Sequence, residues 1–524
     1  MNQINKALIM RRALWLFIFF ISIVLRIVFI DVIPGNGALN QDEAFAGYEA
    51  WSLLKYGIDA EGLSFPIYFV AWGSGMNVLE SYLMIPIIRI LGLNNFSIRL
   101  PSAFGGIITV LVFYLFARKD LRDKDGSFSM VCMLFMAIVP WNVMISRWAL
   151  ESNLLPVFLL LGGFFFIKGI NKSFYFVISM LFYGMSLYTY SVAWVVMPFF
   201  IGGEFLYILF FNKHRIDKWL VLSIVVLCFF SVPLVLFVLV NCDGINEISF
   251  LGITVPKLPY FRSREVNIEN LISNFARLKD IVIFQRDGLV HNSINCGIYY
   301  KISIIFFIVG IIGFFYNFKS YKRNVPCLLM GGQFICGIVL GILIEGNINR
   351  VNIIHIPIIY IICTGIYEVL SFAKKTRYYF SICGAIIIAY AFSFWLFFSS
   401  YINDYNKDFA LTYGEGLREA VIFSCSQCVD GDINIMDANY ANVLLYSQYP
   451  TDEYVDTVIW EDKTAAFRTI IEFGNYKFNE FTCNEVEFND IYVCNKDNRK
   501  AMQYMISNHL TLSVFGNYVV GYME

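Results

Sequence analysis

Charged side chains are scarce in this chain of 524 residues, because Asp, Glu, Lys and Arg together make up only 15% of it. A soluble globular protein carries about 25%, so the composition excludes an ordinary soluble domain. The charges nearly cancel, to a formal net charge of −1, and no basic surplus is present to attract nucleic acid. A P-loop, a GxGxxG fingerprint and a Ser/His/Asp constellation are also missing, so the common nucleotide and hydrolase signatures do not apply.

The sequence contains long hydrophobic runs instead, and 58% of its residues are hydrophobic. A helix needs about 20 mainly apolar residues to cross a bilayer, and about eleven runs satisfy this condition. The first follows Lys6, Arg11 and Arg12 as a signal peptide would, but its apolar core is too long for one. The expected spans are 13–33, 99–118, 127–146, 153–170, 174–191, 194–212, 219–240, 300–318, 325–344, 351–372 and 378–400.

The positions of Lys and Arg in the short loops predict the orientation of these spans. With the N-terminus inside, the basic residues of five loops all fall on the cytoplasmic side: Arg118, Lys119, Arg122, Lys124, Lys168, Lys172, Lys213, Arg215, Lys218, Lys319, Lys322, Arg323, Lys374, Lys375 and Arg377. The segments 34–98 and 241–299 and the chain beyond 401 are then outside. We therefore expect an integral protein of a bacterial cell membrane, with its functional loops on the extracytoplasmic face.

Two domains are expected, a transmembrane domain over 1–400 and a small extracytoplasmic α/β domain over 401–524. In the first outer loop, Asp42–Tyr56 and Met76–Leu91 read as amphipathic helices that lie on the membrane surface. After 401, the pattern predicts a helix near 414–424, a strand at 432–436 and a helix near 442–449.

The most conspicuous polar motif is Asn40-Gln41-Asp42-Glu43, directly after the first span. Two adjacent carboxylates close to lipid are costly to desolvate, so such a pair suggests function. Taken alone, however, an Asp-Glu pair more often marks a solvated helix start, where acids are favoured.

The surrounding sequence resembles the C-type (GT-C) membrane glycosyltransferases, in the branch that holds the protein O-mannosyltransferases and the lipid A aminoarabinose transferase. The resemblance covers roughly residues 10–370 and leaves out the C-terminal domain. The stretches that carry it are Asp42-Glu43-Ala44, 72–77, 92–103, Pro140-Trp141, 146–153, 349–352 and Ile356-Pro357.

The resemblance implies the GT-C fold, with inverting transfer of a hexosyl or pentosyl group from a polyprenyl-phosphate donor. The acceptor is expected to be a cell-surface glycan, a lipid or a protein, and membrane lipids surround the site. The first acid of the motif, Asp42, is the implied general base, because an acceptor hydroxyl is a weak nucleophile. No cofactor is expected, and a divalent metal is not favoured because the first outer loop lacks an Asp-x-Asp motif.

Further candidate residues lie on the same predicted face. Glu43 and Glu151 are candidate catalytic acids, although Glu151 also fits an ion pair with Arg147, four residues earlier. The leaving lipid phosphate needs cationic stabilisation, which an arginine fork supplies well. The candidates for binding substrate or phosphate are Arg350, Arg147, Arg99, Glu80, Asp287 and Asn349. Snorkelling to lipid headgroups is the alternative for the arginines, a solvated helix face for Glu80, and a turn for Asp287-Gly288.

Four cysteines fall in the predicted C-terminal domain, namely Cys425, Cys428, Cys483 and Cys494. Their spacing is too wide for a strong zinc prediction, and one or two disulfides are favoured if the domain faces an oxidising space. Asp430-Gly431-Asp432 fits a metal-binding Asp-x-Asp pattern, but we interpret it as a turn.

Three other function classes compete with the transferase: a transporter or flippase of lipid-linked sugars, a polymerase or ligase of lipid-linked glycans, and a non-catalytic membrane assembly protein that displays the C-terminal domain. The last would not need the clustered acids of the outer loops. Transporters tend to place ionisable residues near the bilayer midplane and to contain internal repeats. Here the acids and arginines gather at the ends of spans and no repeat is present. This distribution favours an enzyme that works at one membrane face.

Overall fold

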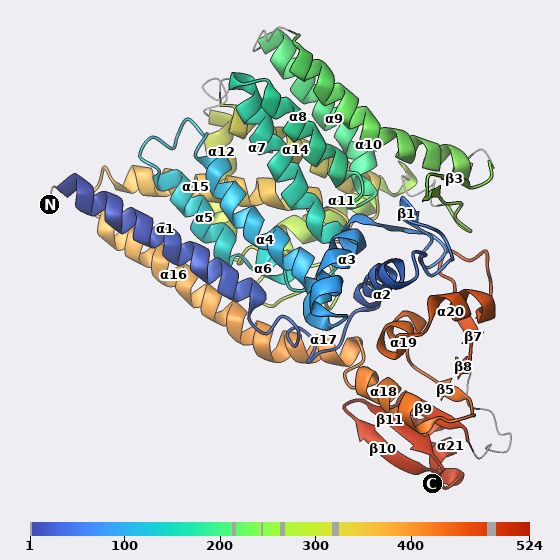
Figure 1. Cartoon of the computed structure of the whole chain (residues 1–524). Coiled ribbons are helices and arrows are strands. Elements are labelled where there is room, and N and C mark those ends of the chain that lie inside the picture. Colours follow the sequence, from blue (N-terminus) through green and yellow to red (C-terminus); the bar gives the residue numbers. More distant parts are fainter. Residues whose placement is uncertain are drawn as a thin grey trace. The chain divides into compact units, whose positions relative to one another are not determined.

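The computed structural model describes residues 3–211, 216–242, 245–261, 268–316, 324–478, 481 and 489–523 (Figure 1). The chain divides into two compact units. The first unit comprises Met1–Val28, Ser102–Val232 and Arg264–Tyr401, and the second comprises Phe29–Pro101, Pro233–Ser263 and Ile402–Glu524. Two helices continue through a boundary, α4 (Asn95–Ala117) at Pro101 and α10 (Lys218–Cys242) at Pro233. A proline removes one helical hydrogen bond, which makes these points natural places for a division.

The first unit is helical throughout its described part. Besides portions of α4 and α10, its helices are α1 (Gln3–Ile27), α5 (Ser127–Ile138), α6 (Pro140–Ile145), α7 (Leu155–Asn171), α8 (Phe174–Ser186), α9 (Val192–Leu206), α11 (Leu271–Lys279), α12 (Ser303–Tyr316), α14 (Val325–Leu343), α15 (His355–Ala373) and α16 (Tyr379–Ser400). Short helical turns extend α7 and α15 at their starts and α9 and α11 at their ends: Glu151–Leu154, Asn352–Ile354, Tyr207–Phe211 and Asp280–Phe284. Within this unit α15 packs closely on α12, and α7 on α8.

The helices confirm the expected polytopic membrane architecture. Among the described residues, seven helical segments are long and apolar enough to cross a membrane: Asn95–Ala117, Glu151–Asn171, Val192–Phe211, Lys218–Cys242, Val325–Leu343, Asn352–Ala373 and Tyr379–Thr412. Three shorter apolar helices, Ser127–Ile138, Phe174–Ser186 and Ser303–Phe314, occupy three further expected positions. The remaining expected span corresponds to α1, which ends at Ile27 rather than at 33.

One expected span, 127–146, is broken into α5 and α6. The break lies at Val139, which is extended (φ −62°, ψ 131°) and precedes Pro140. A proline disfavours the helical conformation of the residue before it, which explains the interruption. The backbone N–H of Trp141 donates instead to the carbonyl of Ile298, 2.9 Å away.

The second unit combines the first outer loop with the C-terminal part. Its helices are α2 (Gln41–Lys55), α3 (Leu79–Leu91), α17 (Asn406–Thr412), α18 (Leu417–Gln427), α19 (Tyr440–Ser447), α20 (Thr451–Thr457) and α21 (Arg499–Ser507). The predicted helix near 414–424, strand at 432–436 and helix near 442–449 correspond to α18, β5 and α19.

A seven-stranded mixed sheet forms the centre of the C-terminal part, in the order β10-β11-β9-β5-β8-β7-β6. Strand β5 is parallel to both neighbours, and the remaining pairs are antiparallel. The strands are β5 (Ile433–Ile435), β6 (Ile459–Trp460), β7 (Ile470–Phe473), β8 (Tyr476–Lys477), β9 (Ile491–Asn495), β10 (Thr511–Phe515) and β11 (Tyr518–Tyr522). Two short hairpins, β1–β2 (Tyr68–Phe69, Met76–Asn77) and β3–β4 (Ile248–Phe250, Ile253–Val255), complete the unit.

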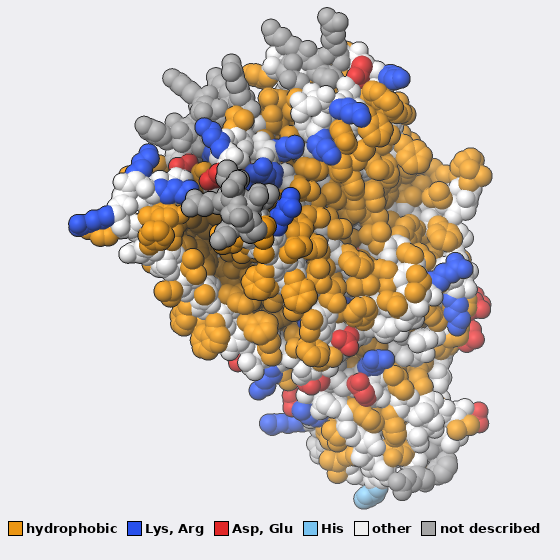
Figure 2. Space-filling model, turned by 60° about the vertical axis from the view of Figure 1, so that its left-hand side comes forward, with side chains coloured by type: hydrophobic (Ala, Val, Ile, Leu, Met, Phe, Trp, Pro, Cys, Tyr) orange, Lys and Arg blue, Asp and Glu red, His pale blue; other side chains and the backbone are white. Residues whose placement is uncertain are grey.

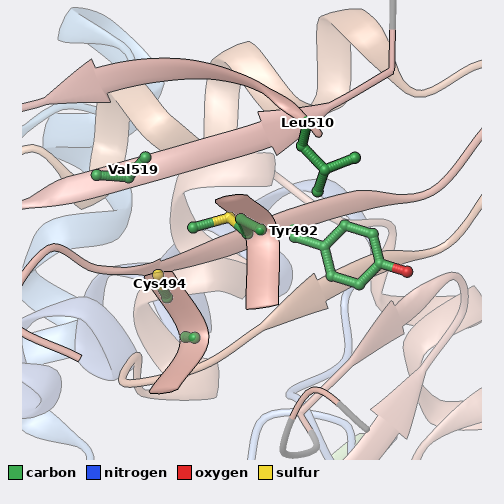
Figure 3. Close-up of a cluster of buried hydrophobic side chains, with 6 residues drawn as sticks. Tyr492, Cys494, Leu510 and Val519 are labelled. Atoms are coloured by element: carbon green, nitrogen blue, oxygen red, sulfur yellow. The ribbon is translucent and has the colours of Figure 1, made fainter. Parts of the chain in front are cut away.

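Apolar side chains from β9, β11 and α21 close the core at one end of this sheet (Figure 3). The cluster contains Tyr492, Cys494, Ala501, Met505, Leu510 and Val519. Cys494 is fully buried there as a free thiol, and Cys425 and Cys428 are also free. No disulfide therefore joins these three cysteines, whereas Cys483 lies outside the described residues.

Helix α2 differs from the amphipathic surface helix that the sequence suggested. Every residue from Glu43 to Leu53 is buried, so the helix is covered on all sides within the second unit. It packs on α3 and on α19. The Tyr48 hydroxyl donates to the carbonyl of Tyr449 at 2.9 Å, and the Ser52 hydroxyl donates to Thr451 Oγ1 at 2.8 Å. The first outer loop and the C-terminal part thus share one core.

Candidate functional site

Asp42 stands in the first turn of α2, at a helix start that the local sequence specifies. The side chain of Asn40 caps the helix by accepting the N–H of Asp42 at 2.8 Å. The Glu43 carboxylate reaches back to accept the N–H of Asn40 at 3.0 Å, which completes a capping box. Asp42 is half-buried while Glu43 is fully buried. The helix N-terminus favours the ionised form of a carboxyl group placed there.

A buried ion pair holds this helix start in place. Arg99 Nε donates to Glu43 Oε1 at 2.8 Å, and its Nη2 donates to Oε2 at 3.1 Å. The other three N–H groups of the guanidinium donate to the carbonyls of Ile30, Pro34 and Ala38, each at 3.0 Å. All five donors of Arg99 are therefore used, and both side chains of the pair are inaccessible. In this conformation neither Glu43 nor Arg99 is open to a ligand, and the pair fixes the loop that leads to Asp42.

A second pair of buried acids in this unit was not found by sequence reasoning. Glu49 lies seven residues after Asp42, so two helical turns place the two acids on the same face of α2. The Glu49 carboxylate accepts the N–H of Ala60 at 3.0 Å, and Asp59 Oδ1 accepts the N–H groups of Glu61 and Leu63. Burial first, and the proximity of Asp59 second, raise the pKa of Glu49 well above its usual range. Burial likewise raises the pKa of Asp59 to about 7.

Glu80 was expected on a second surface helix, and it lies in the first turn of α3, almost fully buried. Its helix is amphipathic as predicted: Glu80, Ser81, Met84 and Ile88 are buried, and Ile90 is exposed. The location of Glu80 beside Asn77, which is also buried, gives the second unit another polar group in its interior. No ligand contact of Glu80 follows from this position alone.

A polar cavity of about 320 Å³ lies in the second unit. Two aromatic rings, those of Phe96 and Tyr446, form part of its wall. Its polar lining comes from Asp31, Asn36, Asn94, Asn95, Arg418 and Glu419. Ala38 and Gly414 also line it, and Tyr413, next to Gly414, interacts through its side chain with Asn40. The cavity is thus close along the chain to the start of α2.

Several outer-loop residues of the first unit are joined by a separate hydrogen-bond network. Asn352 accepts a hydrogen bond from Trp141 Nε1 at 3.2 Å and donates to the carbonyl of Ser152 at 2.8 Å. Because Ser152 follows Glu151 in the chain, this contact ties the Glu151 turn to the segment that holds Asn349 and Arg350. Glu151 itself is half-buried at the start of its turn.

Asp287 belongs to the same network. Its carboxylate accepts the side-chain amide of Asn292 at 2.7 Å and the N–H of Ile348 at 2.9 Å. His355 reaches the carbonyl of Ile348 through Nε2 at 2.8 Å and contacts the hydroxyl of Tyr299 through Nδ1. The contacts of Asp287 and His355 with Ile348 fix the loop before Arg350, so Asp287 has a structural role.

Arg350 is the most available of the three candidate arginines. It is half-exposed, and among the described residues its guanidinium makes one long hydrogen bond, 3.3 Å from Nη1 to the carbonyl of Glu345. The backbone N–H of Arg350 donates to Asn347 Oδ1 at 2.8 Å, which fixes the backbone of this turn. The preceding residue, Asn349, is buried, and its Oδ1 has no hydrogen-bond partner among the described residues.

Arg147 is buried and anchors the end of α1. Its two terminal nitrogens donate to the carbonyls of Leu25 and Val28 at 2.8 and 2.9 Å, and its guanidinium lies 5.9 Å from the Tyr401 ring centroid. A second buried arginine, Arg26, donates to carbonyls of Ser22, Met136 and Ala137. Sequence reasoning missed Arg26, although a lone arginine inside an apolar run is itself a signal.

Among the residues described by the structure, no group of three or more His, Cys, Asp or Glu side chains is arranged to hold a metal ion. Asp432 of the Asp-x-Asp pattern pairs with Lys477 across the sheet. This contact agrees with the interpretation of 430–432 as a turn before β5.

Residues 77–238 match the family model described as dolichyl-phosphate-mannose-protein mannosyltransferase. The comparison with curated protein sequences gives no match. Among solved structures, ArnT from Cupriavidus metallidurans in the apo state is similar over 99% of this chain and 98% of its own, with a TM-score of 0.56 and 13% identity. The same protein bound to undecaprenyl phosphate gives a TM-score of 0.52 and 12% identity, over 97% of each chain.

A third solved structure is the archaeal oligosaccharyltransferase AglB from Archaeoglobus fulgidus, in complex with an inhibitory peptide and a dolichol-phosphate. It is similar with a TM-score of 0.52 and 13% identity, over 94% of this chain and 70% of its own. At these identities the likenesses show a shared fold, and they extend over nearly the whole chain.

Proposed function

We propose that this chain, a polytopic membrane protein with the GT-C fold of membrane glycosyltransferases, transfers a sugar from a polyprenyl-phosphate carrier to an acceptor. The fold similarity to a structure that holds undecaprenyl phosphate and to one that holds dolichol-phosphate supports the lipid-phosphate donor. The predicted orientation of the spans puts the reaction on the extracytoplasmic face of a bacterial cell membrane.

The observation that carries the proposal is the contrast between Asp42 and Glu43. Glu43 is fully buried in its ion pair with Arg99, whereas Asp42 is partly exposed on the helix start that this pair fixes. A general base needs an accessible carboxylate at a fixed position. We therefore assign Asp42 as the base and Glu43 as a positioning residue.

In the proposed reaction, the acceptor O–H attacks the anomeric carbon and its proton passes to the Asp42 carboxylate. The bond between that carbon and the phosphate oxygen breaks, and polyprenyl phosphate leaves with both bonding electrons. A single displacement inverts the anomeric configuration. The guanidinium of Arg350 makes a single long hydrogen bond to the part of the chain that the structure describes, and an arginine fork matches the geometry of the phosphate it would stabilise.

The polar cavity is a candidate binding site for the acceptor. Amide, carboxylate and guanidinium groups together with two aromatic rings complement a hydroxyl-rich molecule, which offers both hydrogen bonds and apolar ring faces. We propose that the cavity receives a carbohydrate part of the acceptor, which favours a glycan or glycolipid over an unmodified protein.

The test is transfer of labelled sugar from a panel of polyprenyl-phosphate sugars by the purified protein. Asp42→Asn should abolish consumption of the donor that the wild type uses, because the amide cannot accept the proton. Arg350→Ala should lower kcat by about 10²-fold, as for loss of one stabilising donor. Asp408→Asn, an exposed acid in the second unit, is the matched control and should retain full activity.

Full activity of folded Asp42→Asn would remove Asp42 as the base while leaving the transferase intact. No consumption of any donor by folded wild type would overturn the transferase itself and favour a transporter of lipid-linked sugars.

A further inference from the structure

A groove of about 550 Å³ lies in the first unit, between α1, α4 and α5, and the proposed transfer reaction does not use it. Three arginines line it: Arg11 and Arg12 from α1, and Arg118 from the end of α4. The remaining wall is aromatic and aliphatic, with Trp15, Tyr114 and Met130 among its residues. None of the described residues that line the groove is acidic. Figure 2 shows Lys and Arg side chains gathered near one edge of a broad hydrophobic surface.

The three guanidinium groups differ in how far their charge is compensated. Arg118 pairs with Asp123, with 2.6 Å between Nη1 and Oδ2. Arg11 donates to the carbonyl of Asp125 at 2.5 Å, which satisfies one N–H, and no carboxylate of the described residues forms an ion pair with it. Arg12 is exposed, and no carboxylate pairs with it in the described part of the chain. The groove therefore carries about two unbalanced positive charges.

The guanidinium of Arg11 lies against the backbone of the turn before α5, where it donates to the carbonyl of Asp125. Gly126 in this turn is left-handed (φ +74°), and a Cβ atom there would lie 1.2 Å from Nη2 of Arg11. Glycine therefore leaves room for the guanidinium beside the turn, and a larger residue would displace this flexible side chain. On the apolar side, the rings of Trp15 and Tyr114 meet edge to face with centroids 6.2 Å apart. The wall thus joins α1 to α4.

Cations above an apolar wall, at the ends of membrane-spanning helices, complement an amphiphile with an anionic head. A free phosphate ion would use the arginines but leave the Trp15 and Tyr114 surface without a partner. We propose that this groove binds the phosphate headgroup of an anionic membrane lipid, whose acyl chain covers the aromatic wall. The lipid then bridges α1 to α4 and α5, on the face that the charge distribution predicts to be cytoplasmic.

The experiment places the full-length protein in nanodiscs of phosphatidylcholine with increasing phosphatidylglycerol, and native mass spectrometry counts the lipids retained after release. Wild type is expected to retain phosphatidylglycerol in preference to phosphatidylcholine and to melt at a higher temperature in its presence. Arg12→Gln removes an exposed charge that pairs with no carboxylate in the described ranges, so the variant should fold normally and weaken retention. Arg11→Gln/Arg12→Gln should weaken retention about tenfold or more.

The matched control is Arg377→Gln, an exposed basic residue predicted on the same membrane face but outside the groove. It should retain the lipid as wild type does. Equal retention of the two lipids by wild type, or an unchanged preference in the double variant, would overturn the site. Stabilisation of the protein in pure phosphatidylcholine by millimolar inorganic phosphate, abolished in the double variant, would instead assign the groove to the free ion and reject the lipid.

Discussion

The buried acids Glu49 and Asp59 make a prediction about stability and pH. Asp59 is fully buried, faces the like charges of Glu61 and Glu247 as well as Glu49, and has one carboxylate oxygen, Oδ2, without a hydrogen-bond partner among the described residues. Its pKa is about 7, against an ordinary value of 3.8. Asp59→Asn keeps an Oδ1 acceptor for the N–H groups of Glu61 and Leu63 and replaces the unpartnered oxygen by a donor. The variant should therefore be more stable than wild type near neutral pH.

The sign of the effect follows from the direction of the shift. Between about pH 4 and pH 7 the unfolded chain has released the Asp59 proton, whereas the folded protein still holds it. The contribution of Asp59 to the free energy of unfolding is thus highest below pH 4 and falls by about 1.4 kcal/mol per pH unit. It becomes constant above about pH 7. The whole window corresponds to about 4 kcal/mol.

The assay is thermal unfolding of the detergent-solubilised full-length protein, followed by tryptophan fluorescence at pH 4.5, 6 and 7.5. Asp59→Asn should raise Tm by several degrees at pH 7.5, and the gain should shrink towards zero at pH 4.5. Asp408→Asn, an exposed acid in the same unit, should shift Tm little at any pH. A gain that is absent at pH 7.5, or equal at all three pH values, would refute the reasoning that burial holds the proton on this pair.

Two further predictions concern the second unit. Arg99→Met leaves the Glu43 carboxylate buried without its cation, and the variant should be less stable by about 3–5 kcal/mol. In the same thermal assay, Glu43→Gln combined with Arg99→Met should recover part of that loss. An unaltered Tm of the single variant would contradict the structural role of the pair. Arg418→Ala at the polar cavity should raise KM for a carbohydrate acceptor while leaving Tm and donor binding unchanged. A fall in kcat with constant KM would show that Arg418 does not bind the acceptor.

The membrane spans could be predicted because the bilayer fixes both the length and the composition of a crossing helix. Loop charges gave an orientation consistent with every expected span. The break at Pro140 was also readable in principle, since proline disfavours a helical residue before it. By contrast, the order β10-β11-β9-β5-β8-β7-β6 depends on pairings between strands of two to five residues. Such short segments carry too little pattern to specify their neighbours.

Local sequence was enough to find the acidic motif, but not to predict that Glu43 is buried in an ion pair while Asp42 is partly exposed. Asn40 and Glu43 form a capping box that three residues of spacing reveal. That Glu43 pairs with Arg99 depends on a contact 56 positions away along the chain. Glu49 was missed because an acid on a helix is usually solvated, and only tertiary burial shows otherwise. The available signal was the apolar run directly before it, Ala44-Phe45-Ala46-Gly47-Tyr48, which is unusual for a solvated helix.

The fate of the three candidate arginines shows how structural and ligand-binding roles separate in a membrane protein. A guanidinium withdrawn from water must find partners for its N–H groups, because each unsatisfied donor costs about 1–3 kcal/mol. All five N–H groups of the Arg99 guanidinium are hydrogen-bonded within the second unit. The two terminal nitrogens of Arg147 donate to the carbonyls of Leu25 and Val28 at the end of α1. The guanidinium of Arg350 makes a single hydrogen bond of 3.3 Å within the described ranges of the chain, and the residue remains half-exposed. An anionic ligand binds most strongly to an arginine whose N–H donors are not already bonded within the protein. By this criterion Arg350 is the strongest of the three candidates for binding the lipid phosphate.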